Sequence, residues 1–553
     1  MEILESAHIP PYELPGGEPV SDAGVSQRVG TGPAVEPRQS SAQVPPLKFR
    51  PRTAIGASGR GTQDKEITVN GNLTRRRFFA QSAATTAAVS LSPGILAAAP
   101  RRPNIVLCMG DDHGWFETGY NNHPYLRTPT LDEMAAKGLK LERMYSAAPL
   151  CSPTRGSIMT GRHPNRYGTF APNCSLRPEE ITIARILGNA GYVCGHFGKW
   201  HLGPVKAGSP TNPGAMGFHE WLSHDNFFEM NPPLVRNGGP VQRFEGESSE
   251  IIMREAIRFI GDAKRNGKPS FTVVWFGSPH APYSGTTDDL ALYKDLKEVG
   301  YPLSEVLRGR YAEITALDRS MGELRKFLRA QGLRQNTLIW YCGDNGVWSD
   351  GRLNMPLRGF KGQIYDGGLR VPGIIEWPDG IPAPKSSDVN AVTTDMLPTI
   401  CDLLGLTLPD RPLDGISLRS AIENRMAERP KPICFWQYDG AREAKENPEP
   451  YIDPELQLGT TPTTSQDRIP FRNFRHPRAR TSNFGGTAAI LDNRYKLVAP
   501  KEGAFELYDV RSDIGESKDL SSAQPGVVKE MERQLRDWQR SVEVSLTGAD
   551  YRG

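Results

Sequence analysis

The sequence lacks an excess of charge of either sign, since its 553 residues carry a formal net charge of only +3. A whole-chain attraction to nucleic acid is therefore excluded, and no nucleic-acid partner is expected. Cysteine is also scarce, and the seven that are present cannot all pair. Three of them, Cys108, Cys194 and Cys342, lie within apolar runs that are typical of buried thiols. The fold must therefore depend on a hydrophobic core and not on disulfides.

The first 70 residues lack the apolar side chains that a core requires. They are rich in Pro, Gly, Ser and Arg, and their aromatic residues are Tyr12 and Phe49. Such a composition cannot offset the entropy of ordering the chain, which predicts a disordered extension over residues 1–70. No methionine lies between Met1 and Met109. We hypothesise that translation begins at a non-AUG codon near Val69, because export signals stand at the N-terminus.

Residues 71–99 resemble a twin-arginine export signal. Arg75, Arg76 and Arg77 precede two phenylalanines, a weakly apolar stretch and the small residues 97–99. The alternative is an amphipathic or membrane-spanning helix. However, Gln81 and the many Ser and Thr residues leave no long apolar run, so the stretch is too polar for a stable membrane insertion. We therefore expect export to the periplasm or the cell exterior.

Beyond residue 100 the sequence alternates short apolar runs with amphipathic stretches. The apolar runs predict strands over 104–109, 192–197, 271–276 and 337–342, and helices are expected between them, for example over 248–264 and 311–332. This alternation predicts an α/β fold with a large, mostly parallel sheet flanked by helices. We assign residues 100–430 to one domain with this fold, which is the predicted catalytic domain.

The last part of the chain has a different pattern. Three apolar runs, at 432–438, 487–499 and 504–510, precede an amphipathic stretch over 526–542. Consecutive strands followed by one helix are typical of an antiparallel sheet. Residues 431–553 are therefore expected to form a smaller C-terminal α+β subdomain.

Each of the four predicted strands runs into polar residues at its carboxyl end. These residues are Asp111 and Asp112, then Lys199 and His201, then His280, and finally Asp344 and Asn345. Open α/β sheets bind ligands at this edge, so the four groups are expected to form one site.

The oxygen ligands Asp111, Asp112, Asp344 and Asn345 favour Ca²⁺ or Mg²⁺ over Zn²⁺. Positive charge and protons around such a cation would come from Arg155, Lys199, His201, His280 and Lys361. The combination suits a tetrahedral oxyanion.

Cys151 lies in the segment PLCSPTRGSIMTG, residues 149–161, which contains no base next to the thiol. A cysteine nucleophile needs such a base or a strongly lowered pKa. A cysteine hydrolase that pairs Cys151 with His163 is a weak alternative, because nothing adjacent would orient His163.

The segment 149–161 resembles the first signature of the type I sulfatases, Cys/Ser-x-Pro-x-Arg followed by Thr-Gly. The segment GYVCGHFGKWHLG, residues 191–203, resembles their second signature. MGDDHG, PHAP, GDNG and KGQIYDGGLRVP resemble the family's metal and substrate motifs and occur in the family's order. Two residues depart from the family's pattern: Cys194 replaces a common Thr within a strand, and Asp366 replaces a common Glu. The resemblance extends from residue 103 to about residue 521 and implies an alkaline-phosphatase-like fold.

The resemblance implies that Cys151 is oxidised to the aldehyde formylglycine by a maturing enzyme. One hydroxyl of the hydrated aldehyde would attack sulfur, and the second would expel sulfate as the aldehyde re-forms. Five residues would hold one Ca²⁺ ion, namely Asp111, Asp112, Cys151 once converted, Asp344 and Asn345. Arg155 would hold the diol, and Lys199 and Lys361 would bind sulfate oxygens. His201 would assist collapse of the diol, and His280 would act as the general acid.

The predicted activity is hydrolysis of an alkyl or aryl sulfate ester. The expected substrate is more specifically a sulfated carbohydrate. The alternatives are a phosphate or phosphonate monoester hydrolase of the same superfamily and a non-catalytic, Ca²⁺-dependent glycan-binding protein. No oligomeric state is predicted.

Residues 468–480 form a basic segment with two interleaved phenylalanines. It contains Arg468, Phe471, Arg472, Phe474, Arg475, Arg478 and Arg480. One interpretation is a solvated loop that pairs with acidic residues of the stretch 443–455. The other is a subsite for neighbouring anionic groups of a glycan, in which the phenylalanines stack on sugars. Its opposite wall would then contain Trp221, Phe227, Phe228, Arg236 and Arg243.

Overall fold

The computed structural model describes residues 102–298, 301–302, 304–349, 355–438, 450, 452–478, 485–501 and 503–551. The extension predicted over 1–70 and the export segment predicted over 71–99 lie outside the described residues. Within those residues, no helix combines the length and the apolar character needed to cross a bilayer.

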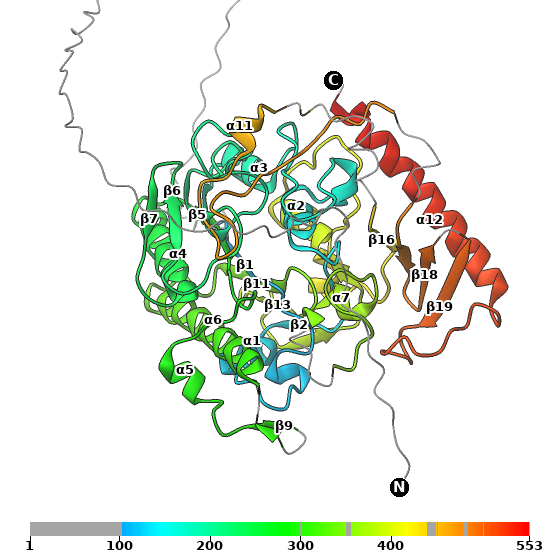
Figure 1. The fold of residues 1–553 in the computed structure, drawn as a ribbon, viewed down its shortest axis with the longest axis horizontal. Coiled ribbons are helices and arrows are strands. Elements are labelled where there is room, and N and C mark those ends of the chain that lie inside the picture. Colours follow the sequence, from blue (N-terminus) through cyan, green and yellow to red (C-terminus); the bar gives the residue numbers. More distant parts are fainter. Residues whose placement is uncertain are drawn as a thin grey trace, which may run out of the picture. The chain divides into compact units, whose positions relative to one another are not determined.

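The centre of the fold is a ten-stranded sheet in the order β14-β2-β13-β11-β1-β8-β4-β5-β6-β7 (Figure 1). Five adjacent strands in its middle run parallel: β11 (Thr337–Gly343), β1 (Asn104–Gly110), β8 (Ser270–Trp275), β4 (Val193–Lys199) and β5 (Glu220–His224). β13 (Gly373–Glu376) and β6 (Pro233–Arg236) pair antiparallel on either side of these five. The predicted α/β class with a large, mostly parallel sheet is confirmed.

Smaller elements extend the sheet and the loops around it. They are β2 (Leu139–Leu141), β14 (Lys385–Ser387), β7 (Val241–Arg243), β9 (Lys297–Glu298), β10 (Tyr301–Pro302), α5 (Thr287–Ala291), α7 (Asp366–Leu369) and α9 (Arg419–Ile422). A separate three-stranded sheet contains β12 (Arg370–Val371), β3 (Met144–Tyr145) and β15 (Ala391–Val392).

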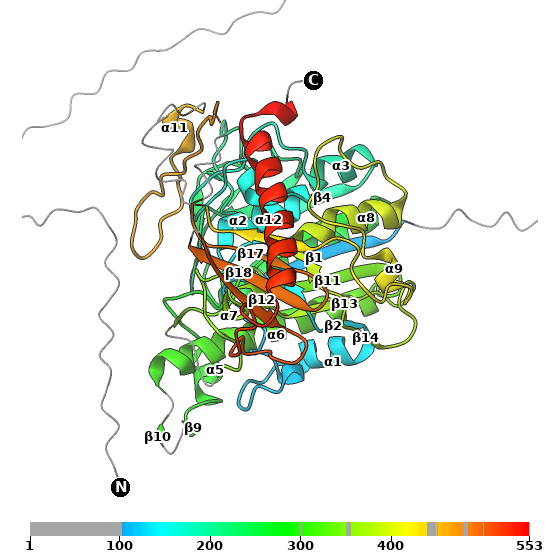
Figure 2. The same ribbon diagram turned by 90° about the vertical axis from the view of Figure 1, so that its right-hand side faces the viewer.

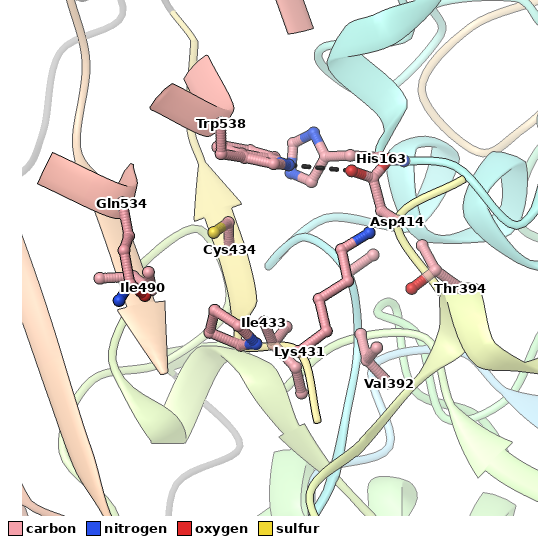
Figure 3. Close-up of a pocket in the computed structure, with 12 residues that line it drawn as sticks. His163, Val392, Thr394, Asp414, Lys431, Ile433, Cys434, Ile490, Gln534 and Trp538 are labelled. Atoms are coloured by element: carbon pink, nitrogen blue, oxygen red, sulfur yellow. Dashed lines mark hydrogen bonds between the residues drawn. The ribbon is translucent and has the colours of Figure 1, made fainter. Parts of the chain in front are cut away.

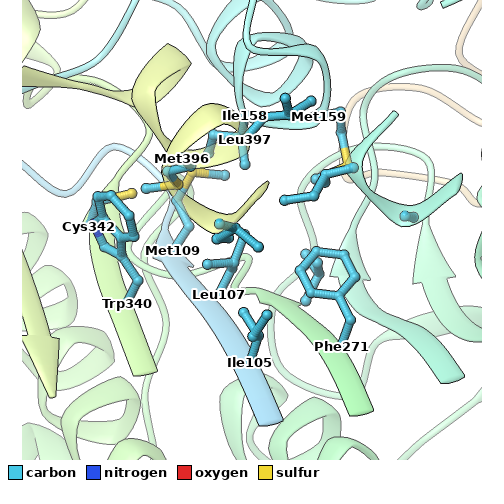
Figure 4. Close-up of a cluster of buried hydrophobic side chains, with 14 of the residues drawn as sticks. Ile105, Leu107, Met109, Ile158, Met159, Phe271, Trp340, Cys342, Met396 and Leu397 are labelled. Carbon is cyan, nitrogen blue, oxygen red and sulfur yellow. The ribbon is translucent and has the colours of Figure 1, made fainter. Parts of the chain in front are cut away.

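Alternate side chains of β1 enter two hydrophobic layers on opposite faces of the sheet. Ile105, Leu107 and Met109 pack beneath α2 (Cys151–Thr160), α3 (Ile183–Asn189) and α8 (Met396–Leu404) (Figure 4). Val106 and Cys108 pack against α1 (Pro129–Lys137), α4 (Ser248–Arg265) and α6 (Glu305–Ala330). Burial of each large aliphatic side chain contributes about 1.5–3 kcal/mol. The central strands are apolar on both faces because helices cover both faces.

The C-terminal part contains a four-stranded antiparallel sheet, β16 (Ile433–Trp436), β17 (Ala488–Leu491), β18 (Tyr495–Lys501) and β19 (Ala504–Asp509). The helix α12 (Pro525–Leu546) covers one face of this sheet through Leu535 and Val542 (Figure 2). The other face, which includes Phe435, packs against Tyr145 and Leu369. The predicted small antiparallel sheet is confirmed, whereas the boundary at residue 430 stays a prediction.

One segment of the C-terminal part, residues 452–478, leaves the small sheet and contacts loops of the large one. It contains α11 (Pro454–Gln457), labelled in Figure 1, and the ammonium group of Lys206, between β4 and β5, donates a hydrogen bond to the carbonyl oxygen of Glu455 on this helix. The carboxylate of Asp225, directly after β5, accepts hydrogen bonds from the backbone N–H groups of Thr460 at 2.6 Å and Thr461 at 2.7 Å. A β-bridge joins Arg472 to Cys174. These contacts bring residues 452–478 to the edge of the sheet that carries the predicted site.

Candidate active site

Backbone hydrogen bonds tie together the ends of three adjacent central strands. The N–H of Asp344 donates to the carbonyl of Gly110 at 3.1 Å, and the N–H of Asp111 donates to the carbonyl of Ser278 at 3.0 Å. The N–H of Asp112 donates to Oδ1 of Asp344 at 2.9 Å. The loops after β1, β8 and β11 therefore meet at one point, as the positions of their polar residues predicted.

Three buried carboxylates at this point each face a fixed cation. Nζ of Lys199 lies 2.6 Å from Oδ2 of Asp111, and Nη2 of Arg155 lies 2.7 Å from Oδ2 of Asp344. Nζ of Lys361 lies 2.7 Å from Oδ1 of Asp112. The amide of Asn345 donates to the same Oδ1 of Asp112 at 2.8 Å.

The electrostatic environment differs among the three carboxylates. Burial raises the pKa of Asp111, but the opposing charges of Lys199, His280 and Arg155 are stronger together and hold it well below its usual range. Lys361 has the same net effect on the pKa of Asp112. The pKa of Asp344 instead rises to about 7, because burial and the charge of Asp111 outweigh the effect of Arg155. Of the three carboxylates, Asp344 is therefore the one whose charged form the protein's own cations offset least.

Cys151 is the first residue of α2 and is only 2% exposed. Its Sγ lies within 4.8 Å of carboxylate oxygens of Asp111 and Asp344. Burial raises the pKa of the Cys151 thiol, although Lys199 and Lys361 oppose the shift. The protein thus keeps the unmodified side chain as a thiol, which is a poor nucleophile.

His163 belongs to a different region. Its backbone N–H donates to Asp414 at 2.6 Å, and its ring packs edge-on against Trp538 at 4.8 Å between centroids. These residues, together with Lys431 and Cys434, line a cavity with a volume of about 90 Å³ beside the small sheet (Figure 3). The structure therefore gives no support to a cysteine hydrolase that pairs Cys151 with His163.

Both predicted histidines lie beside the carboxylate cluster. Nε2 of His280 is 3.9 Å from Oδ2 of Asp112, and burial and the Lys361 charge lower the pKa of His280 to about 4. Nε2 of His201 is 2.8 Å from Oδ1 of Asn173, and its Nδ1 is buried with no hydrogen-bond partner among the described residues. Burial holds the pKa of His201 well below its usual range. Burial thus disfavours the charged form of both imidazoles.

Arg310 on α6 is a residue of the site region that sequence reasoning missed. Its guanidinium donates to the carbonyl oxygens of Asp112 at 2.6 Å and Pro279 at 2.7 Å. It also pairs with both carboxylate oxygens of Glu117, at 2.6 and 2.7 Å. This pair braces the loops that carry Asp112 and His280. The sequence feature that could have identified Arg310 is a charged residue at a position on the apolar face of an amphipathic helix.

The basic segment, described over residues 468–478, lies beside the site, but one of its two phenylalanines is not available to a sugar. Phe471 is buried, with its ring centroid 6.2 Å from that of His201, so it does not stack on a sugar. Arg472 is exposed, and its N–H donates to the carbonyl of Asn173 at 3.0 Å. Arg480 and residues 443–449 of the acidic stretch lie outside the described residues.

The proposed opposite wall also needs correction. Phe228 is buried in the core, and Arg236 pairs with Glu220 and Glu255. Phe227 is half-buried and stacks on His280. Trp221 is half-buried, and Arg243 is exposed on β7.

A buried cluster of carboxylates and fixed cations, at the carboxyl edge of an α/β sheet, defines the class as a hydrolase for tetrahedral oxyanions. Residues 103–406, more than half of the 553, match the family model described as Sulfatase. The chain belongs to the sulfatase family and is a sulfatase enzyme.

Curated relatives agree with this assignment, and solved structures share the fold. The chain is 33% identical to N-acetylgalactosamine-6-sulfatase of Mus musculus, over 61% of this chain and 70% of that protein. It is 32% identical to arylsulfatase A of Homo sapiens, over 60% and 69% of the two chains. Its fold is similar to that of Ps i-CgsB in complex with k-i-k-neocarrahexaose (TM-score 0.66, 24% identity, 80% and 93% covered). It is also similar to the fold of the phosphonate monoester hydrolase of Agrobacterium radiobacter (TM-score 0.54, 19% identity, 80% and 96% covered).

Proposed function

We propose that this sulfatase releases sulfate from a sulfated carbohydrate, using formylglycine derived from Cys151 and one Ca²⁺ ion. The observation that carries the proposal is the placement of Cys151 within 4.8 Å of two buried carboxylates, surrounded by Arg155, Lys199 and Lys361. Ordinary thiol catalysis does not need such a cluster, whereas transfer of an anionic group does.

The donor set fits a hard cation. Asp111, Asp112, Asp344 and Asn345 present only oxygens, and Oδ1 of Asp111 and Oδ1 of Asn345 are buried with no hydrogen-bond partner among the described residues. Unpaired buried oxygens of this kind are available to a metal ion or an ordered water molecule. Ca²⁺ suits them because it accepts several flexible oxygen ligands, and the converted residue 151 would complete the set. When bound, the cation would offset the crowded carboxylate charge and polarise the oxygens of the sulfate group.

The residue at position 151 must be converted before it can serve this chemistry. Cys151 stands in the order Cys-Ser-Pro-Thr-Arg, and a formylglycine-generating enzyme is therefore a required partner. Formylglycine supplies a hydrated aldehyde with two hydroxyls, one to attack sulfur and one to expel sulfate.

The side chains around residue 151 have separate roles in this proposal. Lys199 and Lys361 bind sulfate oxygens. Arg155 holds the hydroxyl side of residue 151, and its ion pair with Asp344 orients it. His201 accepts the proton that is released as sulfate leaves. His280 donates a proton to the departing alcohol oxygen, and the negative charge of a bound ester favours the protonated imidazole.

A comparison of two substrates tests the reaction class. We expect a higher kcat/KM for an aryl sulfate than for the aryl phosphate with the same leaving group. A preference for the phosphate would instead support a phosphate or phosphonate monoester hydrolase, whose fold is compatible with this one.

We also propose that the chain is exported to the periplasm or the cell exterior through its twin-arginine-like segment. Support comes from Arg75 and Arg76 followed by phenylalanines and small residues. Replacement of both arginines by lysine should leave the precursor in the cytoplasm, as measured by cell fractionation. Unchanged export of this variant would contradict the proposal.

Replacement of Arg472 and Arg475 by alanine should raise KM for a sulfated oligosaccharide by about 5- to 10-fold, because charged hydrogen bonds to neighbouring anionic groups are lost. The effect should be larger at low salt, where screening is weak. A small aryl sulfate should be turned over at nearly the wild-type rate, since it does not reach these residues. Arg533→Ala, an exposed arginine on α12, is the control. Equal losses on both substrates would place Arg472 and Arg475 in the fold or the central site.

A further inference from the structure

The ring of Phe227 lies flat against the imidazole of His280. The two centroids are 4.5 Å apart, and the ring planes differ by only 12°. Phe227 lies in the loop between β5 and β6, whereas His280 follows β8. Stacking of this kind fixes the plane of the imidazole.

The loop that carries Phe227 is anchored on both sides. Asp225 is fully buried, and its carboxylate accepts hydrogen bonds from Val205 at 2.8 Å and Thr460 at 2.6 Å. On the other side of Phe227, the side chain of Phe228 is buried in the core beneath the sheet. Phe227 is therefore presented to His280 by a segment with little freedom to move.

Gly277 allows this loop to approach the loop of His280. A Cβ atom built at residue 277 would lie only 2.5 Å from the carbonyl oxygen of Phe228. No side chain fits there without displacement of the backbone that carries Phe227. The stack thus depends on a glycine three residues before His280.

The second constraint on the imidazole is a hydrogen bond. Nδ1 of His280 lies 2.6 Å from the carbonyl oxygen of Ala281, so Nδ1 carries a proton and donates it to that oxygen. A ring held in its plane by Phe227 and about its axis by this bond directs Nε2 toward the cluster at Asp112. Nε2 is the nitrogen that remains for the substrate.

We propose that Phe227 is a positioning residue for His280 and thereby controls proton donation to the leaving group. The inference rests on the proposed role of His280 as general acid. In that step the attacking oxygen of residue 151 forms a bond to sulfur, and the bond between sulfur and the alcohol oxygen breaks. The electron pair of the broken bond goes to the alcohol oxygen, and the proton on Nε2 of the protonated imidazole is transferred to it. Loss of the stack allows the imidazole to rotate away, and the oxygen then departs without a proton.

The test uses two aryl sulfates of similar size. 4-Nitrophenyl sulfate releases a stable phenolate and needs little protonation, whereas 4-methylphenyl sulfate releases a more basic oxygen and needs the acid. Phe227→Ala should lower kcat on 4-methylphenyl sulfate by on the order of 10-fold or more, because general acid catalysis contributes about 10²–10⁴-fold. The kcat on 4-nitrophenyl sulfate should change little.

Three further variants make the comparison specific. Gly277→Ala, which leaves Phe227 in place but crowds its loop, should show the same preference for the nitro substrate. Phe227→Tyr keeps an aromatic face and should retain most of the activity on both substrates. Phe505→Ala removes a half-buried phenylalanine from β19, outside the site, and should show no leaving-group dependence.

His280→Ala separates failure of the inference from failure of the proposed function. If His280→Ala is selective for the nitro substrate and Phe227→Ala loses equally on both substrates, Phe227 acts only in the fold or in binding. If His280→Ala itself shows equal losses, His280 is not the acid, and the role of Phe227 fails with it. If Phe227→Ala does not fold, Phe227→Leu replaces it, because leucine fills the volume but has no flat ring face. Phe227→Leu should then lose kcat on 4-methylphenyl sulfate and not on 4-nitrophenyl sulfate.

Discussion

Replacement of Cys151 by alanine should abolish sulfate ester hydrolysis, with a loss of at least about 10³-fold in kcat, while the protein remains folded. The variant removes the carbon that is to become the aldehyde but leaves the carboxylate cluster intact. Cys151→Ser should be nearly as inactive, because a single hydroxyl can attack sulfur but cannot expel sulfate as an aldehyde re-forms. The measurements are turnover of an aryl sulfate and thermal unfolding.

The matched control is Cys434→Ala, because Cys434 is a half-buried thiol on β16 outside the site. It should keep wild-type turnover. In the wild-type protein, the peptide that contains residue 151 should be lighter than its thiol form by about 18 Da, the difference between a thiol and an aldehyde in this chemistry. Near wild-type turnover by Cys151→Ala would rule out the formylglycine mechanism. A wild-type peptide at full thiol mass, in a protein that binds glycans without turnover, would support the non-catalytic alternative.

Asp344→Ala should weaken Ca²⁺ binding and reduce turnover by about 100-fold or more, since loss of even an outer partner of a metal ligand costs about 10–100-fold. Asp344 contributes both carboxylate oxygens to the cluster, one facing Arg155 and one accepting the N–H of Asp112. Its removal therefore takes away a proposed metal ligand and the charge that orients Arg155. Ca²⁺ affinity is to be measured by calorimetry, and excess Ca²⁺, but not Zn²⁺, should restore part of the turnover.

Loss of a buried ion pair alone destabilises a protein by about 3–5 kcal/mol, so this effect needs its own control. Asp395 offers a close match, because it is fully buried and pairs with both Nη atoms of Arg429, at 2.6 and 2.9 Å. Asp395→Ala should lower stability without any change in Ca²⁺ affinity. Full activity of the wild-type protein after exhaustive chelation would contradict the metal proposal.

The fold class and the meeting point of the site were predictable because both depend on local patterns. Apolar runs such as residues 104–109 and 337–342 identified central strands, and the polar residues that follow them marked the carboxyl edge. Strand ends were less accurate: Lys199 is the last residue of β4 and does not follow it. Such an error arises because hydrogen bonding to a neighbouring strand, here β5, decides where a strand ends.

Long-range contacts were not predictable from periodicity. Phe471 meets His201, and Arg310 meets Glu117, only because the chain folds back between them. The aromatic residues of the basic segment suggested stacking on sugars. However, the sequence alone does not show whether a phenylalanine ring lies in a core or on a surface. Only the placement of the segment 452–478 against the loop of Asn173 decides between the two.

The complete burial of α2 sets the order of events during biosynthesis. All ten of its residues, from Cys151 to Thr160, are buried. On the proposed mechanism, a maturing enzyme has to reach the thiol and its neighbours, and a helix covered in this way offers it no access. The proposed conversion would therefore compete in time with folding. A chain that folds first would keep the thiol, and a variant that folds more slowly would give the enzyme longer to act. On the proposed export through a twin-arginine route, which carries folded proteins, the oxidation would take place in the compartment of synthesis, before the chain leaves it.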